Sequence, residues 1–156
     1  CLELLEDVVA ADRPAYALDL GTGSGILAIA AARLGVGRVL ACDSDPDAVS
    51  AAVGNARLNG VGDRVSCVVD DAATLIAEPA PLVLANLLAA AHRALAPRYP
   101  RLVAPGGVLI AGGLLDAEND DVAAALAAHG LALEAGRRLE GWSSLALRHA
   151  PLHAAA

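Results

Sequence analysis

Apolar runs with strand-like composition alternate along the chain with segments whose apolar positions recur at helical spacing. The strand-like runs predict seven strands, at residues 16–20, 38–42, 65–69, 82–85, 108–111, 131–137 and 142–148. The helical spacing predicts helices between them, at residues 26–34, 46–59, 88–102 and 118–129. This alternation of strand and helix predicts a parallel sheet with helices on both faces.

Residues with special backbone preferences mark the ends of several predicted helices. Asp45 is expected to cap the helix that follows it, with Pro46 in its first turn. Gly60 supplies the end of that helix. The helix over 88–102 is expected to bend near Pro97 or Pro100, because proline cannot continue the helical hydrogen bonds.

The C-terminal third predicts a change from parallel to antiparallel pairing. Pro105-Gly106-Gly107 is expected to form a turn before the fifth strand. Only Leu139-Glu140-Gly141 separates the last two strand-like runs, which predicts a hairpin. The predicted fold is α/β: a doubly wound, mostly parallel seven-stranded sheet with an antiparallel C-terminal hairpin, of Rossmann-like type. We expect residues 1–156 to form one domain, because no linker or repeat interrupts the pattern.

Composition narrows the class of protein. The chain is 56% hydrophobic and 19% charged, with a mean hydropathy of +0.54, which excludes a disordered protein. No apolar run reaches the roughly 18 residues of a membrane span, and the acidic start lacks the basic residues of a signal peptide. Cys1, Cys42 and Cys67 have neither disulfide nor zinc spacing, and the histidines are scattered. We therefore expect a cytoplasmic protein without metal, in which Cys42 and Cys67 are buried thiols.

The net charge of −7 bears on possible partners. Direct binding of nucleic acid is disfavoured, because phosphate contacts need clustered basic side chains. An acidic face could attract a basic protein substrate. The simpler interpretation is that the charge keeps the protein soluble.

The residues that follow the strands are the candidates for ligand binding. Ligands of doubly wound sheets bind at the carboxyl ends of the strands, where the strand order reverses. The stretch from Asp19 to Gly25, which includes Thr22, follows the first strand, and its Gly21 and Gly23 allow a sharp turn and close backbone approach. Asp43, 22 positions after Gly21, could accept both hydroxyls of a ribose, and Ser44 lies beside it.

Two classes of cofactor fit this loop. A dinucleotide loop reads G-x-G-x-x-G and binds pyrophosphate at a helix N-terminus. Here the third glycine comes one position early, at Gly25, and Ile26 takes the expected place. Asp19, two residues before the first glycine, would repel pyrophosphate but would suit a cofactor with a sulfonium and an amino group. The residues therefore favour S-adenosylmethionine over NAD, and a loop without ligand is the third alternative.

Two further polar positions follow strands. Asn86 ends the fourth strand, and its amide can accept from a cationic amino group and also donate, which makes it a candidate for positioning an amine. Its alternative role is an ordinary helix cap. Asp71 could accept a hydrogen bond from an adenine amino group, with Asp70 as its competitor and a plain loop position as the alternative. No general base is evident, and no catalytic residue is assigned beyond Asn86.

Several motifs resemble those of the PrmA-type ribosomal-protein methyltransferases. They are Asp19-Leu20-Gly21-Thr22-Gly23-Ser24-Gly25 with the helix after it, Asp43-Ser44-Asp45-Pro46, Asn55-Ala56-Arg57-Leu58-Asn59-Gly60, Ala85-Asn86-Leu87-Leu88, Pro105-Gly106-Gly107, Gly112-Gly113-Leu114-Leu115 and Glu140-Gly141-Trp142. The first marks class I methyltransferases in general, whereas the Asn-Leu-Leu and Glu-Gly-Trp segments point to this family. The resemblance covers nearly the whole chain.

The resemblance implies transfer of methyl groups from S-adenosylmethionine to the N-terminal amine and lysines of a large-subunit ribosomal protein. It implies that Gly21, Asp43 and Asn86 hold the cofactor. Leu87 and Leu88 stand where enzymes that methylate planar nitrogens often carry prolines, which fits an aliphatic amine. Trp142 could line the substrate entrance, but we expect it to pack the hairpin onto the sheet.

The resemblance also implies that part of the family's chain lies outside this sequence. The family has an N-terminal domain that docks the ribosomal protein, and a threonine-bearing segment that helps to cover the cofactor. Residues 1–5 resemble the helix that follows that segment, and the sequence contains no methionine. We therefore expect a fragment that lacks the substrate-recognition domain. Rival hypotheses are a methyltransferase for a small molecule or another protein, a binding module without catalysis, and an NAD-dependent oxidoreductase.

Overall fold

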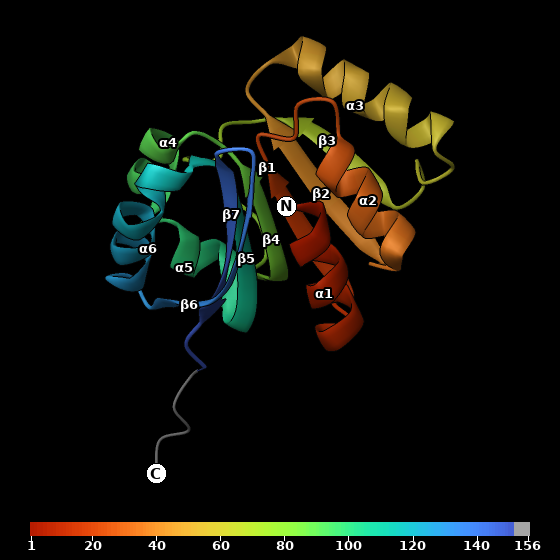
Figure 1. The fold of residues 1–156 in the computed structure, drawn as a ribbon. Helices are drawn as coiled ribbons and strands as arrows, with labels where there is room; N and C mark the ends of the chain where they lie inside the picture. The colour runs from red at the N-terminus through yellow and green to blue at the C-terminus, as the bar shows by residue number, and fades with distance from the viewer. Residues whose placement is uncertain (152–156) are drawn as a thin grey trace.

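A seven-stranded sheet lies between two layers of helices in the computed structural model, which describes residues 1–151 (Figure 1). The strands are β1 (Tyr16–Leu20), β2 (Arg38–Asp43), β3 (Val65–Val69), β4 (Ala80–Asn86), β5 (Val103–Leu115), β6 (Leu131–Leu139) and β7 (Trp142–His149). The helices are α1 (Leu2–Asp12), α2 (Ile26–Leu34), α3 (Pro46–Leu58), α4 (Ala89–Leu95), α5 (Tyr99–Leu102) and α6 (Asn119–Ala127), with the 3-10 turn η1 (Asp116–Glu118) before α6.

The strand order is β3-β2-β1-β4-β5-β7-β6, so the direction of winding reverses between β1 and β4. The first five strands in the chain are parallel, and β7 pairs antiparallel with both β5 and β6. The predicted mostly parallel sheet with a C-terminal hairpin is therefore confirmed. The reversal brings the ends of β1 and β4 side by side, which is where a doubly wound sheet offers its ligand site.

Each face of the sheet has its own apolar core (Figure 1). On one face, α1, α2 and α3 supply Leu4, Leu5, Leu27 and Ala56, which pack with strand residues that are almost fully buried. On the other face, α4, α5 and α6 supply a second buried cluster. The strands between them are apolar on both faces, as buried parallel strands are. Burial of these side chains, at about 1.5–3 kcal/mol each, holds the strand ends in place.

Two predicted segments differ from the structure. The helix expected over 88–102 is broken into α4 and α5 around Pro97, because the predicted proline bend becomes a complete break. The turn expected at Pro105-Gly106-Gly107 is wrong, because these residues lie inside β5. Pairing with β4 already begins at Val103 and resumes after an irregularity, and the φ of +77° at Gly106 accommodates the extra residues.

The C-terminal hairpin turns through two residues. Glu140 and Gly141 have φ angles of +52° and +83°, and Leu139 pairs with Trp142. Two successive left-handed residues give the turn type whose twist matches that of antiparallel strands. The predicted hairpin is thus confirmed, with a link shorter by one residue. Among residues 1–151, no helix is both long and apolar enough to traverse a bilayer.

Candidate functional site

A cavity of about 380 Å³ opens at the carboxyl edge of the sheet, beside the point where the winding reverses. It is lined by residues that follow four neighbouring strands and by one side of α4. They are Gly21, Asp43, Ser44, Asp70, Asp71, Ala72, Ala73, Leu87, Ala91, Ala94 and Leu95. The charged side chains of this lining are all carboxylates. The cavity therefore suits a ligand that is neutral or cationic, and it opposes a phosphate.

Asp43, at the end of β2, is the best-held polar group of this cavity. The backbone N–H of Gly23 donates to its Oδ2 at 2.9 Å, and the backbone N–H of Asp45 donates to its Oδ1 at 3.0 Å. Each carboxylate oxygen keeps a further lone pair. A carboxylate fixed in this way at the cavity wall can accept two neighbouring hydroxyls, which is the function that the sequence predicted for a ribose.

Asp19 lies beneath the glycine loop and is buried, with 1% of its surface exposed. Its Oδ2 accepts a hydrogen bond from the Thr22 hydroxyl at 2.6 Å and from the Ala28 N–H at 3.2 Å. Ala28 belongs to the first turn of α2, whose N–H groups have no partner within the helix. Neither Asp19 nor the buried Thr22 lines the cavity. Both shape the loop from below, and Asp19 occupies the helix N-terminus at which a dinucleotide fold would bind pyrophosphate.

Burial raises the pKa of Asp19 from 3.8 to about 6, and the hydrogen bonds from Thr22 and Ala28 only partly oppose this. The folded protein therefore binds a proton more tightly than the unfolded chain does. The stabilisation that results is complete below about pH 4 and is lost as the pH rises through about 6. The carboxylate is the charged form at neutral pH, where it costs folding free energy.

Replacing Asp19 with asparagine should remove this cost. We expect the gain in the free energy of unfolding, relative to the unchanged protein, to be about 1 kcal/mol larger at pH 8 than at pH 5. Urea unfolding at the two pH values measures it. Asp47→Asn, on the exposed face of α3, makes the same change of residue at the surface and is the matched control. An equal gain for Asp19→Asn at both pH values would contradict a raised pKa.

The loop after β3 contributes two carboxylates to the cavity. The Asp70 Oδ1 accepts from the Asp71 N–H at 2.8 Å and from the Thr74 hydroxyl at 3.2 Å, and the Asp71 Oδ1 accepts from the Ala73 N–H at 2.9 Å. Both candidates for the adenine amino group thus line the same wall. The Arg98 guanidinium, from the break between α4 and α5, donates to the Leu75 carbonyl and ties this loop to the helices.

A second hollow of about 620 Å³ lies on the other side of the end of β4. It is lined by Cys1, Leu2, Glu3, Ile26, Leu27, Asn86, Gly113, Arg137, Arg138, Leu139, Glu140, Trp142, Ser143 and Ser144. We call it the acceptor groove. Asn86 lines the acceptor groove while its neighbour Leu87 lines the first cavity, so the two hollows meet at one strand end. The exposed Asn86 amide lies 3.9 Å from the Cys1 sulfur.

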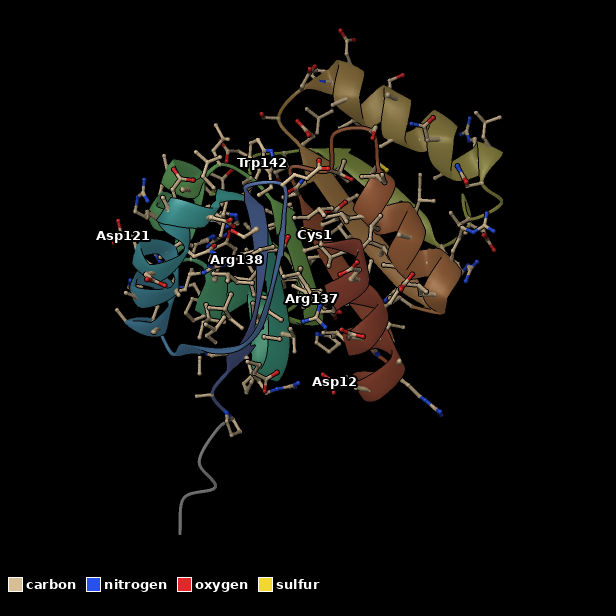
Figure 2. All side chains as sticks on the ribbon, viewed as in Figure 1. Cys1, Asp12, Asp121, Arg137, Arg138 and Trp142 are labelled. Atoms are coloured by element: carbon tan, nitrogen blue, oxygen red, sulfur yellow. The ribbon has the colours of Figure 1, made fainter. Side chains whose placement is uncertain are left out.

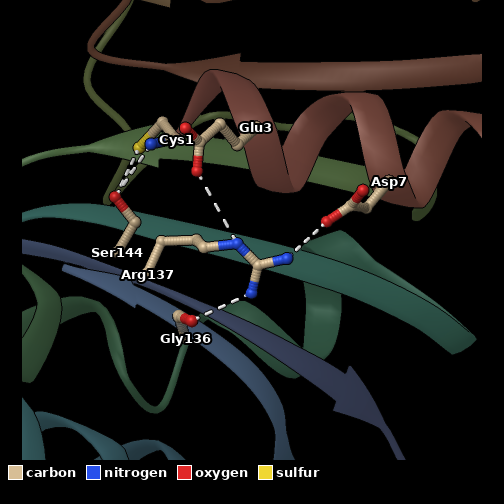
Figure 3. A network of polar contacts seen from close by, with 6 residues as sticks. All are labelled: Cys1, Glu3, Asp7, Gly136, Arg137 and Ser144. Atoms are coloured by element: carbon tan, nitrogen blue, oxygen red, sulfur yellow. Dashed lines mark hydrogen bonds and ion pairs between the residues drawn. The ribbon is translucent and has the colours of Figure 1, made fainter.

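Polar contacts fix one wall of the acceptor groove (Figure 3). The Arg137 guanidinium, on the edge strand β6, lies 2.7 Å from Asp7 and 3.7 Å from Glu3 of α1. The Cys1 sulfur lies 3.3 Å from the Ser144 hydroxyl of β7. These contacts join α1 to the hairpin. Because the ion pairs are largely exposed, they contribute little to stability, of the order of 0–1 kcal/mol each.

Trp142 does not pack the hairpin onto the sheet, as we expected from the sequence. It is the first residue of β7, beside the tip of the hairpin (Figure 2), and 53% of its surface is exposed. Its partners across the strands, Leu115 and Leu139, are also exposed. Trp142 is instead one of the residues that line the acceptor groove.

Of the two thiols expected to be buried, Cys42 is buried and Cys67 is only half-buried. Burial raises the pKa of Cys42 to about 11, so this thiol is not reactive at neutral pH. Among residues 1–151, no group of three or more metal-ligating side chains comes together. His153, one of the scattered histidines, lies outside the described residues.

Sequence reasoning missed the helical wall of the first cavity. Leu87, Ala91, Ala94 and Leu95 recur at the spacing of one helix face, and that face borders the cavity. The spacing was visible in the sequence. It gave no sign of a ligand site, because small apolar residues on one helix face more often pack against a core.

The strand order, the glycine loop above Asp19 and the acid-lined cavity together define a class I methyltransferase fold. The solved structure of an RNA methyltransferase from Salinibacter ruber in complex with S-adenosyl-L-homocysteine shares this fold, with a TM-score of 0.78 and 24% identity. The match covers 99% of this chain and 92% of the RNA methyltransferase chain.

The chain belongs to the family described as "Ribosomal protein L11 methyltransferase (PrmA)", whose model matches residues 1–150. Relatives of that name are 46% identical in Pelotomaculum thermopropionicum and 47% identical in Bradyrhizobium diazoefficiens, each over 95% of this chain. The ribosomal protein L11 methylase of Lactobacillus delbrueckii subsp. bulgaricus superposes with a TM-score of 0.87 and 31% identity, over 96% of this chain and 77% of that one. The resemblance seen in the sequence is thus confirmed. The chain spans about half the length of the curated relatives it matches.

Proposed function

We propose that the protein containing this chain transfers methyl groups from S-adenosylmethionine to amino groups of ribosomal protein L11, at its N-terminal amine and lysines. The observation that carries the proposal is the pair of hollows that meet at Asn86 and Leu87. One is an acid-lined cavity of nucleoside size, and the other is an open groove. The names of the relatives supply the substrate. Because ribosomal proteins are its proposed substrates, we expect this enzyme to act in the cytoplasm.

The residues of the first cavity fit the cofactor. Asp43 would hold the ribose hydroxyls, Asp70 or Asp71 the adenine amino group, and Leu87 would cover the ring with the apolar side of α4. Gly21 has a φ of +67°, which residues with a side chain rarely adopt, so we expect only glycine to fit here without strain. Bound here, S-adenosylmethionine would supply a methyl group on a positively charged sulfonium, and the carboxylates nearby favour a cation.

The acceptor groove fits an amine on a flexible chain. An amine can attack only when it is neutral, and at pH 7 neutralisation costs about 1 kcal/mol for an α-amine and roughly 4.6 kcal/mol for a lysine. The exposed apolar side chains of Ile26, Leu139 and Trp142 line the groove and would exclude water from the amine, which lowers its pKa. Asn86 would accept a hydrogen bond from the neutral amine and direct its lone pair toward the first cavity.

The test is a methylation assay of the whole protein with purified ribosomal protein L11 and S-adenosylmethionine. We expect methyl groups on L11, located by mass spectrometry of its peptides. A second sample of L11 with an acetylated N-terminus should lose only the modification of the α-amine. S-adenosylhomocysteine should inhibit, and NAD should not.

Two results would count against the proposal. Failure to modify L11 while the protein methylates a small amine would reassign the substrate. Binding of NAD in a calorimeter, without a response to S-adenosylhomocysteine, would reassign the class of enzyme.

A further inference from the structure

His92, on α4, is completely buried and has no role in the chemistry proposed above. Its two ring nitrogens both have partners. Nε2 lies 2.9 Å from the carbonyl oxygen of Gly112, on β5, and Nδ1 lies 2.9 Å from the hydroxyl of Tyr99, on α5. Tyr99 is completely buried as well. Buried polar atoms need hydrogen-bond partners, and here one of the two partners, Gly112, lies beside Asn86 in the sheet.

These contacts select one tautomer of the ring. The Gly112 carbonyl can only accept, so Nε2 carries the proton and donates. In the neutral ring Nδ1 then accepts, and the Tyr99 hydroxyl is its donor. Burial lowers the pKa of His92 and raises that of Tyr99, so both groups stay neutral at physiological pH. The direction of every hydrogen bond in the pair is therefore set.

The Gly112 carbonyl connects this pair to the site. It also accepts a hydrogen bond from the Leu87 N–H at 3.1 Å, and Gly112 is the partner of Asn86 in the register of β4 and β5. On its other side β5 has a bulge, because the pairing with β7 shifts between Ala111 and Leu114. At Gly112, β5 thus lacks regular pairing with β7. His92 supports it from the α4 face.

Close contacts couple the end of β4 to the backbone of β5 at Gly112 and Gly113. A Cβ added to Gly112 would come within 2.9 Å of the Asn86 Oδ1, and one added to Gly113 would come within 2.6 Å of the Leu87 carbonyl oxygen. With no side chains between them, the backbone of β5 lies directly against Asn86 and Leu87. A displacement of the Gly112 carbonyl would therefore displace the point where the cavity and the acceptor groove meet.

We infer that His92, oriented by Tyr99, is a positioning residue that fixes the Gly112 carbonyl and through it Asn86 and Leu87 for methyl transfer. The inference rests on the proposed function, because it assigns these two residues to the amine and the cofactor. His92 does not touch either reactant. It acts by holding their binding residues in one arrangement, and a misplacement of about 1 Å can cost 100-fold in rate.

Kinetics of the whole protein test this inference with three variants. His92→Leu fills the space but removes both hydrogen bonds, and we expect kcat to fall about 10- to 100-fold with KM for L11 little changed. Tyr99→Phe removes the donor to Nδ1 and should give a smaller loss of kcat. His92→Gln offers an amide N–H near the position of Nε2 and should restore part of the rate.

A control variant separates positioning from loss of stability. Leu126→Ala, on α6, creates a cavity in the same apolar core without touching the hydrogen-bonded pair. Assayed well below the melting temperature of every variant, it should keep kcat within about twofold of the unchanged protein. A fall in kcat for His92→Leu no larger than for Leu126→Ala would overturn the inference.

Hydrogen exchange supplies a readout that needs no activity. The Leu87 amide should exchange faster in His92→Leu than in Leu126→Ala, because only the former removes the second donor that holds the Gly112 carbonyl in place. Equal exchange in the two variants would also overturn the inference. If the unchanged protein methylated no amine, the proposed function would fail, and the exchange of Leu87 would still decide whether His92 holds this strand end.

Discussion

Replacing Asp43 with alanine is expected to weaken binding of S-adenosylhomocysteine by about 4 kcal/mol, a loss of roughly 1,000-fold in affinity. Two effects add. The variant would lose the charged group that we propose as the acceptor for both ribose hydroxyls. It also frees the N–H groups of Gly23 and Asp45, which Asp43 holds at 2.9 and 3.0 Å, so the loop around the cavity is no longer fixed. Calorimetric titration of the whole protein measures the affinity.

Two control variants distinguish the loss of the Asp43 hydrogen bonds from the loss of one negative charge. Asp47→Ala removes the same charge from α3, outside the cavity lining, and should change the affinity by less than about 0.5 kcal/mol. Asp43→Asn keeps the shape and one acceptor oxygen, and should retain part of the affinity. If Asp43→Ala and Asp47→Ala bound S-adenosylhomocysteine equally well, Asp43 would have no place in the cofactor site.

Replacing Asn86 with alanine is expected to lower kcat for L11 methylation by about 100- to 1,000-fold, or about 3–4 kcal/mol of transition-state stabilisation. The physical reason is the loss of the acceptor that orders the amine where the two hollows meet. Cofactor affinity should change much less than kcat, because Asn86 lines the acceptor groove and not the first cavity. Steady-state methylation with radiolabelled cofactor gives kcat, and titration gives the affinity.

The aspartate variant gives the sharper comparison. Asn86→Asp has the same shape but attracts the charged amine and raises its pKa, so a smaller neutral fraction can react. Its KM for L11 should not rise, while kcat should fall at neutral pH and recover in part at higher pH. Asn59→Ala, at the far end of α3, removes the same amide group away from both hollows and should leave kcat unchanged. A normal kcat for Asn86→Ala would remove Asn86 from the acceptor site.

The parts of the site that sequence reasoning located are those that depend on the ends of strands. The turn from Gly21 to Gly25 and the acid at Asp43 follow from residue types placed directly after apolar runs, and the structure brings the two together. Because parallel strands align their carboxyl ends, residues that directly follow such strands in the sequence lie together at one edge of the sheet. Local residue types were sufficient there.

Other features depended on contacts across the fold. Nothing near Pro105 shows that pairing with β4 would extend a strand through a predicted turn. The exposure of Trp142 at the tip of the hairpin depends on the tertiary arrangement, which its own sequence neighbours do not indicate. The contact of His92 with Tyr99 requires the break between α4 and α5, since a continuous helix places residues seven apart about 10 Å from each other along its axis. Asp19 was identified as part of the loop, but its burial below the loop depends on α2 closing over it.

The burial of Asp19 also bears on selectivity between ligands, because ATP and S-adenosylmethionine share the adenosine group. A site that recognised only adenosine would bind both of these molecules. A carboxylate is already seated against the first turn of α2, and Asp43, Asp70 and Asp71 line the cavity. We therefore expect these negative charges to disfavour the triphosphate tail of ATP, for which related folds offer free N–H groups at this helix end.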